Sequence, residues 1–318
     1  MNNKEVAEKV VNRILDLINQ NGFLPWAKPW SMERNTVRIV DGYTEVTLHP
    51  TAWNRNGVLY KGVNTYLPVG EYITFNQCQK ENGKVKKGAH GFPVVYWNFI
   101  KKETTDDDGE TKIERIPVLK YYTVFSVNDC DGIEQKHSPK PQVIRMENVK
   151  YIPVEDDSLT YDETAEQVIQ NYVSRSNLKL ICDSVSDRAF YSPSLDSVTV
   201  PCRAQYANHD EYYSTMFHEL AHSTGHSTRL NRFTGKAACA AFGSTEYSKE
   251  ELVAEITSAT ILNSLNLETA NSFRNSAAYI KSWSEKIRKD PLCYVSAATK
   301  AQAAFDYILG IPATPAAE

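Results

Sequence analysis

The residues with the clearest chemistry form the motif His-Glu-Leu-Ala-His at positions 218–222. Residues four positions apart lie on the same face of an α-helix, so His218 and His222 could present their imidazole rings to one metal ion. Glu219 lies beside them and could accept a proton from a water molecule on that ion. The spacing therefore predicts a Zn²⁺ site of the metalloprotease type, with Glu219 as the catalytic base for peptide or amide hydrolysis.

The third protein ligand that a catalytic zinc ion usually has must come from outside this motif. The long-spaced metalloprotease pattern would place a third histidine at position 228, where this chain has Thr228, so that arrangement is excluded. A helical stretch over about residues 248–265 carries Glu251 and Glu255 four positions apart on one face. We expect Glu251 to be the third ligand. We expect Glu255 and His226 to be supporting residues behind a histidine or alternative ligands.

An alternative role for Glu251 follows from Ser248, three residues before it. A serine followed three residues later by a glutamate has the spacing of a capping box, in which the glutamate satisfies a helix N-terminus instead of binding a metal. In that arrangement, Glu255 would be the third ligand. The sequence leaves both arrangements open.

The metal motif belongs to a mainly helical second part of the chain, predicted to be a domain of residues 161–318. Helical periodicity indicates helices at about residues 163–176, 208–224, 248–265 and 295–309. The helix that carries the motif would bury its other face, which contains Tyr213, Met216, Phe217 and Leu220. A β-hairpin is predicted within residues 189–201 and would supply a small β-sheet.

The first part, residues 1–132, is predicted to be a domain that mixes a helix at its start with a sheet. Two runs rich in aromatic and β-branched residues, 92–100 and 117–127, flank the polar residues 103–115 and predict a hairpin with a long acidic loop. Residues 133–160 are rich in Pro, Asp and Lys and are predicted to be a linker. The chain is therefore expected to be an α+β protein of two domains.

The composition excludes several classes of protein. The 318 residues include 35 Lys and Arg against 39 Asp and Glu, a net charge of −4, which excludes a strongly basic protein that coats DNA. Apolar runs are too short for a membrane span, so we expect no membrane partner and a cytoplasmic location. The six cysteines are far apart, which predicts reduced and mostly buried thiols rather than disulfides or a thiolate zinc site.

The charge is distributed unevenly, and this bears on a nucleic-acid partner. Residues 1–140 contain 19 Lys and Arg against 17 Asp and Glu, a net charge of +2, and four of the five tryptophans. A surface that binds single-stranded DNA combines basic residues for the phosphates with aromatic rings on which bases stack. The candidates for such contacts are Trp53, Lys61, Asn64, Lys84, Lys86, Lys87, Tyr96 and Trp97. The alternative is that these aromatic residues form a sheet core and the lysines a solvated turn.

Two sets of motifs resemble one known family. The zincin-like metallopeptidase domain of the plasmid antirestriction family ArdC is similar to three segments, AFYSPSLDSVTVP, EYYSTMFHELAHSTGHSTRLNR and YSKEELVAEITSA. The single-stranded-DNA-binding domain of the same family, which is shared with conjugative TraC-type primases, is similar to four segments, NRILDLINQNGFLPWAKPW, YKGVNTYLP, ITFNQCQKENGKVKKGAHGFPVVYW and YYTVFSVNDCDGI. The metal-site residues of the family correspond to His218, Glu219, His222 and Glu251. The resemblance implies a mobile-element protein that protects entering DNA from host restriction enzymes.

Three hypotheses for the function follow. The first is an ArdC-like antirestriction protein that binds single-stranded DNA and hydrolyses a protein substrate at its zinc site. The second is a DNA-binding protein whose zinc is structural and which blocks restriction enzymes sterically. The third is a DNA-dependent protease that acts on DNA-bound proteins. Glu219 distinguishes the second hypothesis from the others, because catalysis requires this residue and a structural zinc site does not.

Overall fold

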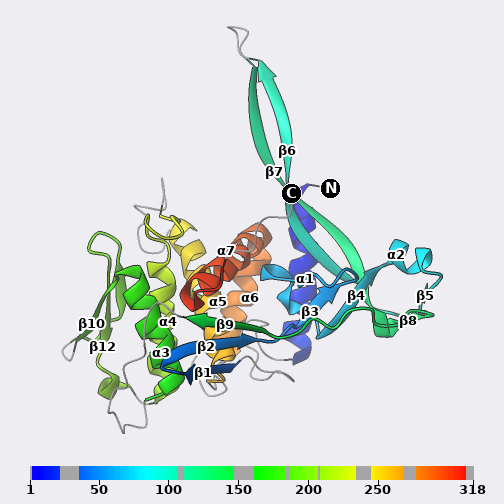
Figure 1. Cartoon of the computed structure of the whole chain (residues 1–318). Coiled ribbons are helices and arrows are strands. Elements are labelled where there is room, and N and C mark those ends of the chain that lie inside the picture. Colours follow the sequence, from blue (N-terminus) through cyan, green and yellow to red (C-terminus); the bar gives the residue numbers. More distant parts are fainter. Residues whose placement is uncertain are drawn as a thin grey trace. The chain divides into compact units, whose positions relative to one another are not determined.

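The computed structural model describes residues 2–21, 36–105, 111–146, 161–183, 186–206, 208–233, 245–267 and 277–312. The chain forms two compact units, each built from separate stretches of sequence. The first unit contains residues 1–22, 51–139 and 284–295, and the second contains residues 23–50, 140–283 and 296–318. Helices and strands occur in both units, which confirms the predicted α+β class (Figure 1).

The first unit is built around a four-stranded sheet with the strand order β3, β4, β7, β6. These strands are β3 (Ala52–Asn54), β4 (Gly70–Thr74), β6 (Phe92–Thr105) and β7 (Thr111–Ser126). Strand β3 runs parallel to β4, whereas β4 and β6 both run antiparallel to β7. Shorter elements are η2 (Gly62–Tyr66), α2 (Phe75–Lys80), η3 (Val127–Asp129) and the paired strands β5 (Lys84–Val85) and β8 (Cys130–Asp131).

Helix α1 (Asn3–Asn21) is the amphipathic helix that the sequence predicts at the start of the chain. Its buried side chains, spaced mostly three or four residues apart, are Val6, Ala7, Val10, Val11, Ile14, Leu15 and Ile18. The Asn3 side chain accepts a hydrogen bond from the Leu119 amide and donates one to the Pro117 carbonyl. These bonds tie the first turn of α1 to β7, and the helix packs against both β6 and β7.

Strands β6 and β7 form the predicted hairpin, and they are longer than expected (Figure 1). Pairing continues to Thr105 and Thr111, so most of the predicted acidic loop belongs to the strands. Thr and Ile in these stretches favour extended backbone, which explains why the strands continue into the predicted loop. Residues 106–110, which contain the acidic run, lie outside the described residues. Strand β4 pairs with residues 124–126 of β7, so the hairpin extends well beyond β4.

The described part of the second unit contains two three-stranded sheets. One has the order β1 (Thr36–Val40), β2 (Tyr43–Leu48), β9 (Gln142–Met146) and is antiparallel. The other has the order β10 (Lys179–Asp183), β12 (Ser197–Pro201), β11 (Phe190–Ser192). Strands β11 and β12 form the predicted hairpin, and β10 runs parallel to β12. Strand β9 lies within the segment predicted as a linker. The local sequence does not indicate this strand, because its partner β2 is distant along the chain.

The other elements of the second unit are mostly helices. They are α3 (Glu163–Ser176), η4 (Arg203–Gln205), α4 (His209–Ser223), α5 (Thr245–Ser264) and the parts of α6 (Ala277–Lys289) and α7 (Pro291–Leu309) that lie outside residues 284–295. Helix α7 begins before the predicted residue 295, because proline is well suited to the first position of a helix. Helix α6 was not predicted from the sequence. Among the described helices, none combines the length and apolar character that crossing a bilayer requires.

Helix α5 begins three residues before its predicted start. Ser248 therefore lies inside the first turn and does not precede the helix, so the capping-box role for Ser248 and Glu251 is wrong. Residues 252–259 are all buried. The Ser258 hydroxyl donates a hydrogen bond of 3.0 Å to the Ser214 carbonyl of α4. This packing fixes the position of α5 against the helix that carries the histidine motif.

The described cysteines are all free, as predicted, but they are less buried than expected. Two of the five described thiols, Cys78 and Cys130, are buried, whereas Cys182 is exposed. The partly exposed ones are Cys202 and Cys293. Cys239 lies outside the described residues. The prediction of mostly buried thiols is thus wrong for the described part of the chain.

Candidate metal centre

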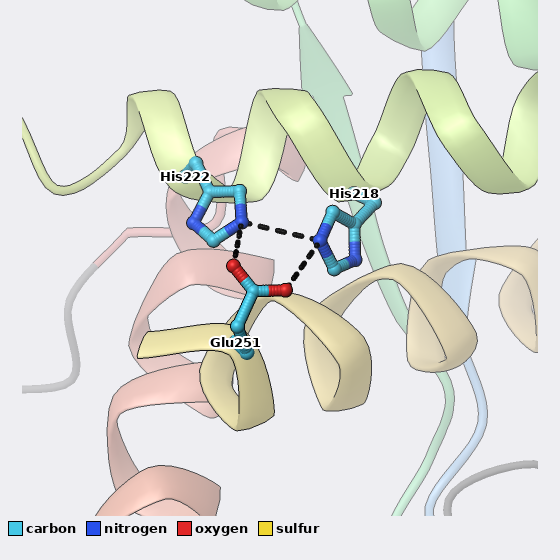
Figure 2. Close-up of side chains that lie close together, drawn as sticks. All are labelled: His218, His222 and Glu251. Carbon is cyan, nitrogen blue, oxygen red and sulfur yellow. Dashed lines mark hydrogen bonds and ion pairs between the residues drawn. The ribbon is translucent and has the colours of Figure 1, made fainter. Parts of the chain in front are cut away.

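Helix α4 carries the His-Glu-Leu-Ala-His motif and is fixed by its cap and its buried side. The Asn208 side chain caps the helix by accepting a hydrogen bond from the Glu211 amide. The buried side chains include the predicted apolar set, Tyr213, Met216, Phe217 and Leu220. Their burial fixes the rotation of α4 about its axis, and His218 and His222 then point toward α5 (Figure 2).

Three side chains from α4 and α5 bring their polar atoms together (Figure 2). The Nε2 atoms of His218 and His222 are 3.1 Å apart. Glu251 places Oε2 at 3.4 Å from His218 Nε2 and Oε1 at 3.3 Å from His222 Nε2. Two ligand atoms at about 2.0–2.1 Å from a tetrahedral zinc ion are themselves about 3.3 Å apart. The observed separations match this spacing, so the two imidazoles and the carboxylate fit a divalent metal ion.

The Nδ1 atom of each histidine faces a further carboxylate on α5. Glu255 Oε2 lies 3.9 Å from His218 Nδ1, and Glu250 Oε1 lies 3.5 Å from His222 Nδ1. Histidines that bind metals usually have such a partner, which orients the ring and sets its tautomer. Glu255 therefore has the position of a supporting residue rather than a ligand. Sequence reasoning missed Glu250, for which the available signal was its place next to Glu251.

Arg232, from the turn after α4, binds Glu250 with two hydrogen bonds. Arg232 Nε lies 3.1 Å from Glu250 Oε2, and Arg232 Nη2 lies 2.6 Å from Oε1. The guanidinium also donates to Thr224 Oγ1 at 2.6 Å and to the Ala221 carbonyl at 2.9 Å. The Arg232 side chain is 6% exposed. A buried cation thus connects the end of α4 with the first turns of α5.

The carboxylates change the proton affinity of the metal-free site. Burial lowers the pKa of His222, but hydrogen bonds to Glu250 and Glu251 raise it more, to about 10. Burial raises the pKa of Glu251, whereas hydrogen bonds from His218 and His222 lower it well below its ordinary range. The pKa of Glu250 is also lowered, because hydrogen bonds from His222 and Arg232 outweigh the effect of burial. A metal ion that binds His222 must therefore displace a proton.

Glu219 and His226, two predicted residues of the metal site, differ in their surroundings. Glu219, the predicted catalytic base, is buried on α4 and interacts electrostatically with His222 and Tyr206. His226 lies beyond the end of α4, where its Nδ1 atom is 2.8 Å from Thr228 Oγ1. The structure therefore does not bring His226 into the group of ligand atoms.

Comparison with known proteins gives matches to both parts of the chain. Residues 4–125 match the N-terminal domain of the anti-restriction factor ArdC, and residues 165–300 match the zincin-like metallopeptidase family. A metal-free crystal structure of the antirestriction protein ArdC from plasmid R388 is 27% identical, with a TM-score of 0.56 over 95% of this chain and 96% of that one. Its Mn(II)-bound structure is 25% identical, with a TM-score of 0.58 over 96% and 97%. The chain is thus similar to ArdC in both of its parts.

Longer proteins are also similar to this chain. A DNA primase TraC of Escherichia coli is 30% identical over 323 residues, which are 96% of this chain and 19% of the primase. A second TraC primase of the same species is 30% identical, and the match covers 27% of its length. The chain thus spans about a fifth to a quarter of these primases. The uncharacterized protein y4eC of Sinorhizobium fredii is 27% identical, and the match covers 96% of this chain and 91% of that protein.

Within the region that matches the ArdC N-terminal domain, two of the predicted DNA-binding residues are buried. The Trp53 indole donates hydrogen bonds to Glu71 Oε2 at 3.3 Å and to the His137 carbonyl at 3.0 Å. The Asn64 side chain donates a hydrogen bond to the Val95 carbonyl at 2.8 Å through Nδ2 and accepts one from the Val95 backbone amide at 3.0 Å through Oδ1. These contacts stabilise the fold, and burial keeps both side chains from a DNA-binding surface.

The other predicted DNA-binding residues of this region lie at or near the surface. The exposed ones are Lys61, Lys84, Lys86, Lys87 and Tyr96, and Trp97 is partly exposed. Tyr96 is 46% exposed and lies directly opposite Lys120 in the β6–β7 register. The ring of Tyr122 lies 6.0 Å from that of Tyr96. The structure therefore adds a basic residue and a second aromatic ring next to Tyr96, which sequence reasoning did not identify.

Proposed function

We propose that the chain is an antirestriction protein of a mobile genetic element that acts in the cytoplasm. In this proposal it combines a metal-dependent hydrolase site with a unit that binds single-stranded DNA. The observation that carries the proposal is the spacing of the ligand atoms of His218, His222 and Glu251, which matches a tetrahedral metal site. Similarity to the antirestriction protein ArdC of plasmid R388 supports the biological role.

Zinc is the metal that we assign to this site. Two imidazoles and one carboxylate are a ligand set that zinc uses in catalytic sites, where a fourth position stays open for water. Manganese, which is bound in the related R388 structure, prefers oxygen ligands and generally binds nitrogen sites more weakly than zinc. We therefore expect zinc to be retained in preference to manganese when both ions are offered at equal concentration.

The chain's own residues suit hydrolysis of a peptide or amide bond. A zinc ion bound here would act as a Lewis acid and lower the pKa of a coordinated water. Glu219 would accept a proton during the attack on the carbonyl carbon and return it to the leaving amine. Glu250 and Glu255 would hold the imidazole rings in the tautomer with the proton on Nδ1 and the lone pair on Nε2. We propose a protein as the substrate.

For DNA, we propose a binding surface on one face of the β6–β7 hairpin. Tyr96 and Tyr122 would stack against bases, and Lys120 would contact a phosphate, since cross-strand neighbours share a face of the sheet. The lysines of the β5 turn, Lys84, Lys86 and Lys87, are exposed and would add further phosphate contacts.

The substitution Glu219→Gln tests the catalytic part of the proposal. Zinc content should stay unchanged, because Glu219 is not a ligand in the proposed site. Hydrolysis of an unfolded protein such as casein should fall by about 100- to 10,000-fold, the usual contribution of a general base. Glu211→Gln, about two turns earlier on α4, is the matched control and should keep both properties.

Protection of DNA against a restriction enzyme, measured with the same two variants, separates the three hypotheses. Loss of protection together with hydrolysis supports a protease. Retained protection in Glu219→Gln supports the binding protein with a structural zinc, and hydrolysis that requires added single-stranded DNA supports the DNA-dependent protease. The catalytic proposal is wrong if Glu219→Gln hydrolyses casein at the wild-type rate.

A further inference from the structure

We propose that Arg232 is a positioning residue of the metal site and acts on His222 through Glu250. The inference rests on the proposed function, since it takes His222 to be a metal ligand. One carboxylate oxygen of Glu250 has both Arg232 and His222 as neighbours. Glu250 Oε1 lies 2.6 Å from Arg232 Nη2 and 3.5 Å from His222 Nδ1. The oxygen that faces the imidazole ring is therefore the oxygen that the guanidinium holds.

The geometry of the Arg232–Glu250 pair limits the movement of that oxygen. Nε and Nη2 of Arg232 bind the two carboxylate oxygens of Glu250 side by side, which fixes the plane of the carboxylate as well as its position. A glutamate side chain otherwise has several rotatable bonds and would sample many positions beside the ring. With Arg232 in place, His222 has one fixed acceptor for its Nδ1 proton, which leaves Nε2 for the metal.

The turn that follows α4 holds the Arg232 backbone in position. The Leu230 amide donates to the Thr224 carbonyl at 2.9 Å, and the Arg232 amide donates to the Gly225 carbonyl at 2.9 Å. Glycine suits position 225 because a Cβ there would come within 2.7 Å of the Phe233 ring. The turn therefore folds back onto the end of α4 and brings Arg232 to α5.

Arg232 also accounts for the different positions of two neighbouring glutamates. Glu250 and Glu251 are adjacent on α5, and either carboxylate could bind a metal on chemical grounds. Arg232 engages both oxygens of Glu250, whereas both oxygens of Glu251 face the Nε2 atoms of the histidines. The guanidinium thus commits Glu250 to supporting His222 and leaves Glu251 as the ligand.

The test compares two buried arginines at the end of α4. Arg232→Gln removes the residue that holds Glu250. Arg229→Gln is the matched control, because Arg229 is 1% exposed, pairs with Asp196 and donates to the Ser223 carbonyl, without contact to Glu250. Zinc affinity of each variant is measured by competition with a chromophoric chelator, and thermal unfolding is measured in parallel.

We expect Arg232→Gln to weaken zinc binding by about 10- to 100-fold, the usual effect of removing a residue that supports a metal ligand. Arg229→Gln should lower the unfolding temperature but keep the wild-type zinc affinity. Arg232→Lys should recover part of the loss, because a lysine keeps the charge but cannot hold both carboxylate oxygens. Arg232→Gln combined with Glu250→Gln should bind zinc about as weakly as either single variant, because the two residues act in series.

A spectroscopic readout separates positioning from general stability. The ring ¹⁵N chemical shifts of His222 in the zinc-loaded protein should change in Arg232→Gln and Glu250→Gln, and they should match the wild type in Arg229→Gln. Equal losses of zinc affinity in both arginine variants would overturn the inference. If Arg232→Gln does not fold, an unchanged affinity in Glu250→Gln would overturn it instead. A wild-type protein that binds no zinc would reject the proposed function itself, so the two failures are distinguishable.

Discussion

At the scale of single residues, the candidate site depends on neighbouring side chains that reach different edges of the same rings. Successive residues on a helix point about 100° apart. Glu251 can therefore face the Nε2 atoms while Glu250 faces His222 Nδ1. The two histidines then have Glu251 beside their Nε2 atoms and a further carboxylate, from Glu255 or Glu250, beside each Nδ1 atom. This arrangement fits a metal ion but also favours a proton on the His222 ring when the ion is absent.

The raised pKa of His222 predicts that zinc binding depends on pH. The metal-free ring keeps its proton up to about pH 10, so zinc must displace one proton at any pH below that value. Apparent zinc affinity should therefore rise by about tenfold per pH unit in this range. Chelator competition at several pH values measures the slope. An affinity that is independent of pH in the neutral range would contradict the prediction.

The same shift has the opposite effect on the metal-free fold. Because the folded-state pKa of His222 is raised, its protonated form stabilises the metal-free protein fully below pH 6.5. This contribution is lost as the pH rises toward 10. Zinc should thus stabilise the protein most in the alkaline part of the range, where protonation no longer does so.

Helical periodicity in the sequence predicted His218, His222 and Glu251, the three residues whose ligand atoms lie together in the structure. The spacing of His218 and His222 is a property of one helix. Glu251 was predicted from its place on a second helix, four residues before Glu255. Glu250 and Arg232 could not be assigned in the same way, because their contacts depend on how the turn after α4 folds back onto α5. Trp53 was misjudged for a similar reason, since its hydrogen-bond partners Glu71 and His137 come from distant parts of the chain.

At the scale of elements, α4 and α5 pack against each other, and small side chains are buried on both helices. Ala221 on α4 and Ala254, Ser258 and Ala259 on α5 are buried, and small residues let helix backbones come close together. The Ser258–Ser214 hydrogen bond gives this packing a fixed register. The buried residues 252–259 of α5 lie on all sides of the helix and include Glu255, Thr257 and Ser258, so no single apolar stripe marks this helix and periodicity located its start imprecisely.

The β6–β7 hairpin carries a prediction about DNA binding. Tyr96→Ala should weaken binding of single-stranded DNA by about 1–3 kcal/mol, because a stacked base loses its aromatic partner. Lys120→Ala should make the slope of log affinity against log salt concentration shallower by about 1, because one phosphate contact is lost. Fluorescence anisotropy with a labelled oligothymidine at several salt concentrations measures both effects.

An exposed aromatic residue elsewhere provides the control for this experiment. Phe190 on β11 is 49% exposed, and Phe190→Ala should bind DNA like the wild type. If Tyr96→Ala and Lys120→Ala also bind like the wild type, the hairpin face is not the binding surface. A similar loss in all three variants would point to nonspecific contacts.

At the scale of the whole molecule, the compact units are discontinuous in sequence. Strand β2 pairs with β9 in the second unit, although helix α1 before it and strand β3 after it belong to the first unit. Composition and turn residues predict continuous domains, since they describe neighbours along the chain. Long-range strand pairing and the clustering of residues 284–295 with the first unit are tertiary facts that such patterns do not contain.

The zinc content of the purified protein shows whether His218, His222 and Glu251 hold a metal ion. After dialysis against metal-free buffer, elemental analysis should find about one zinc ion per chain in the wild type, as expected for a site with three protein ligands. His222→Ala, with its fold checked by circular dichroism, should retain none. A wild-type protein without bound divalent metal, whose unfolding temperature does not change when zinc is added, would contradict the account.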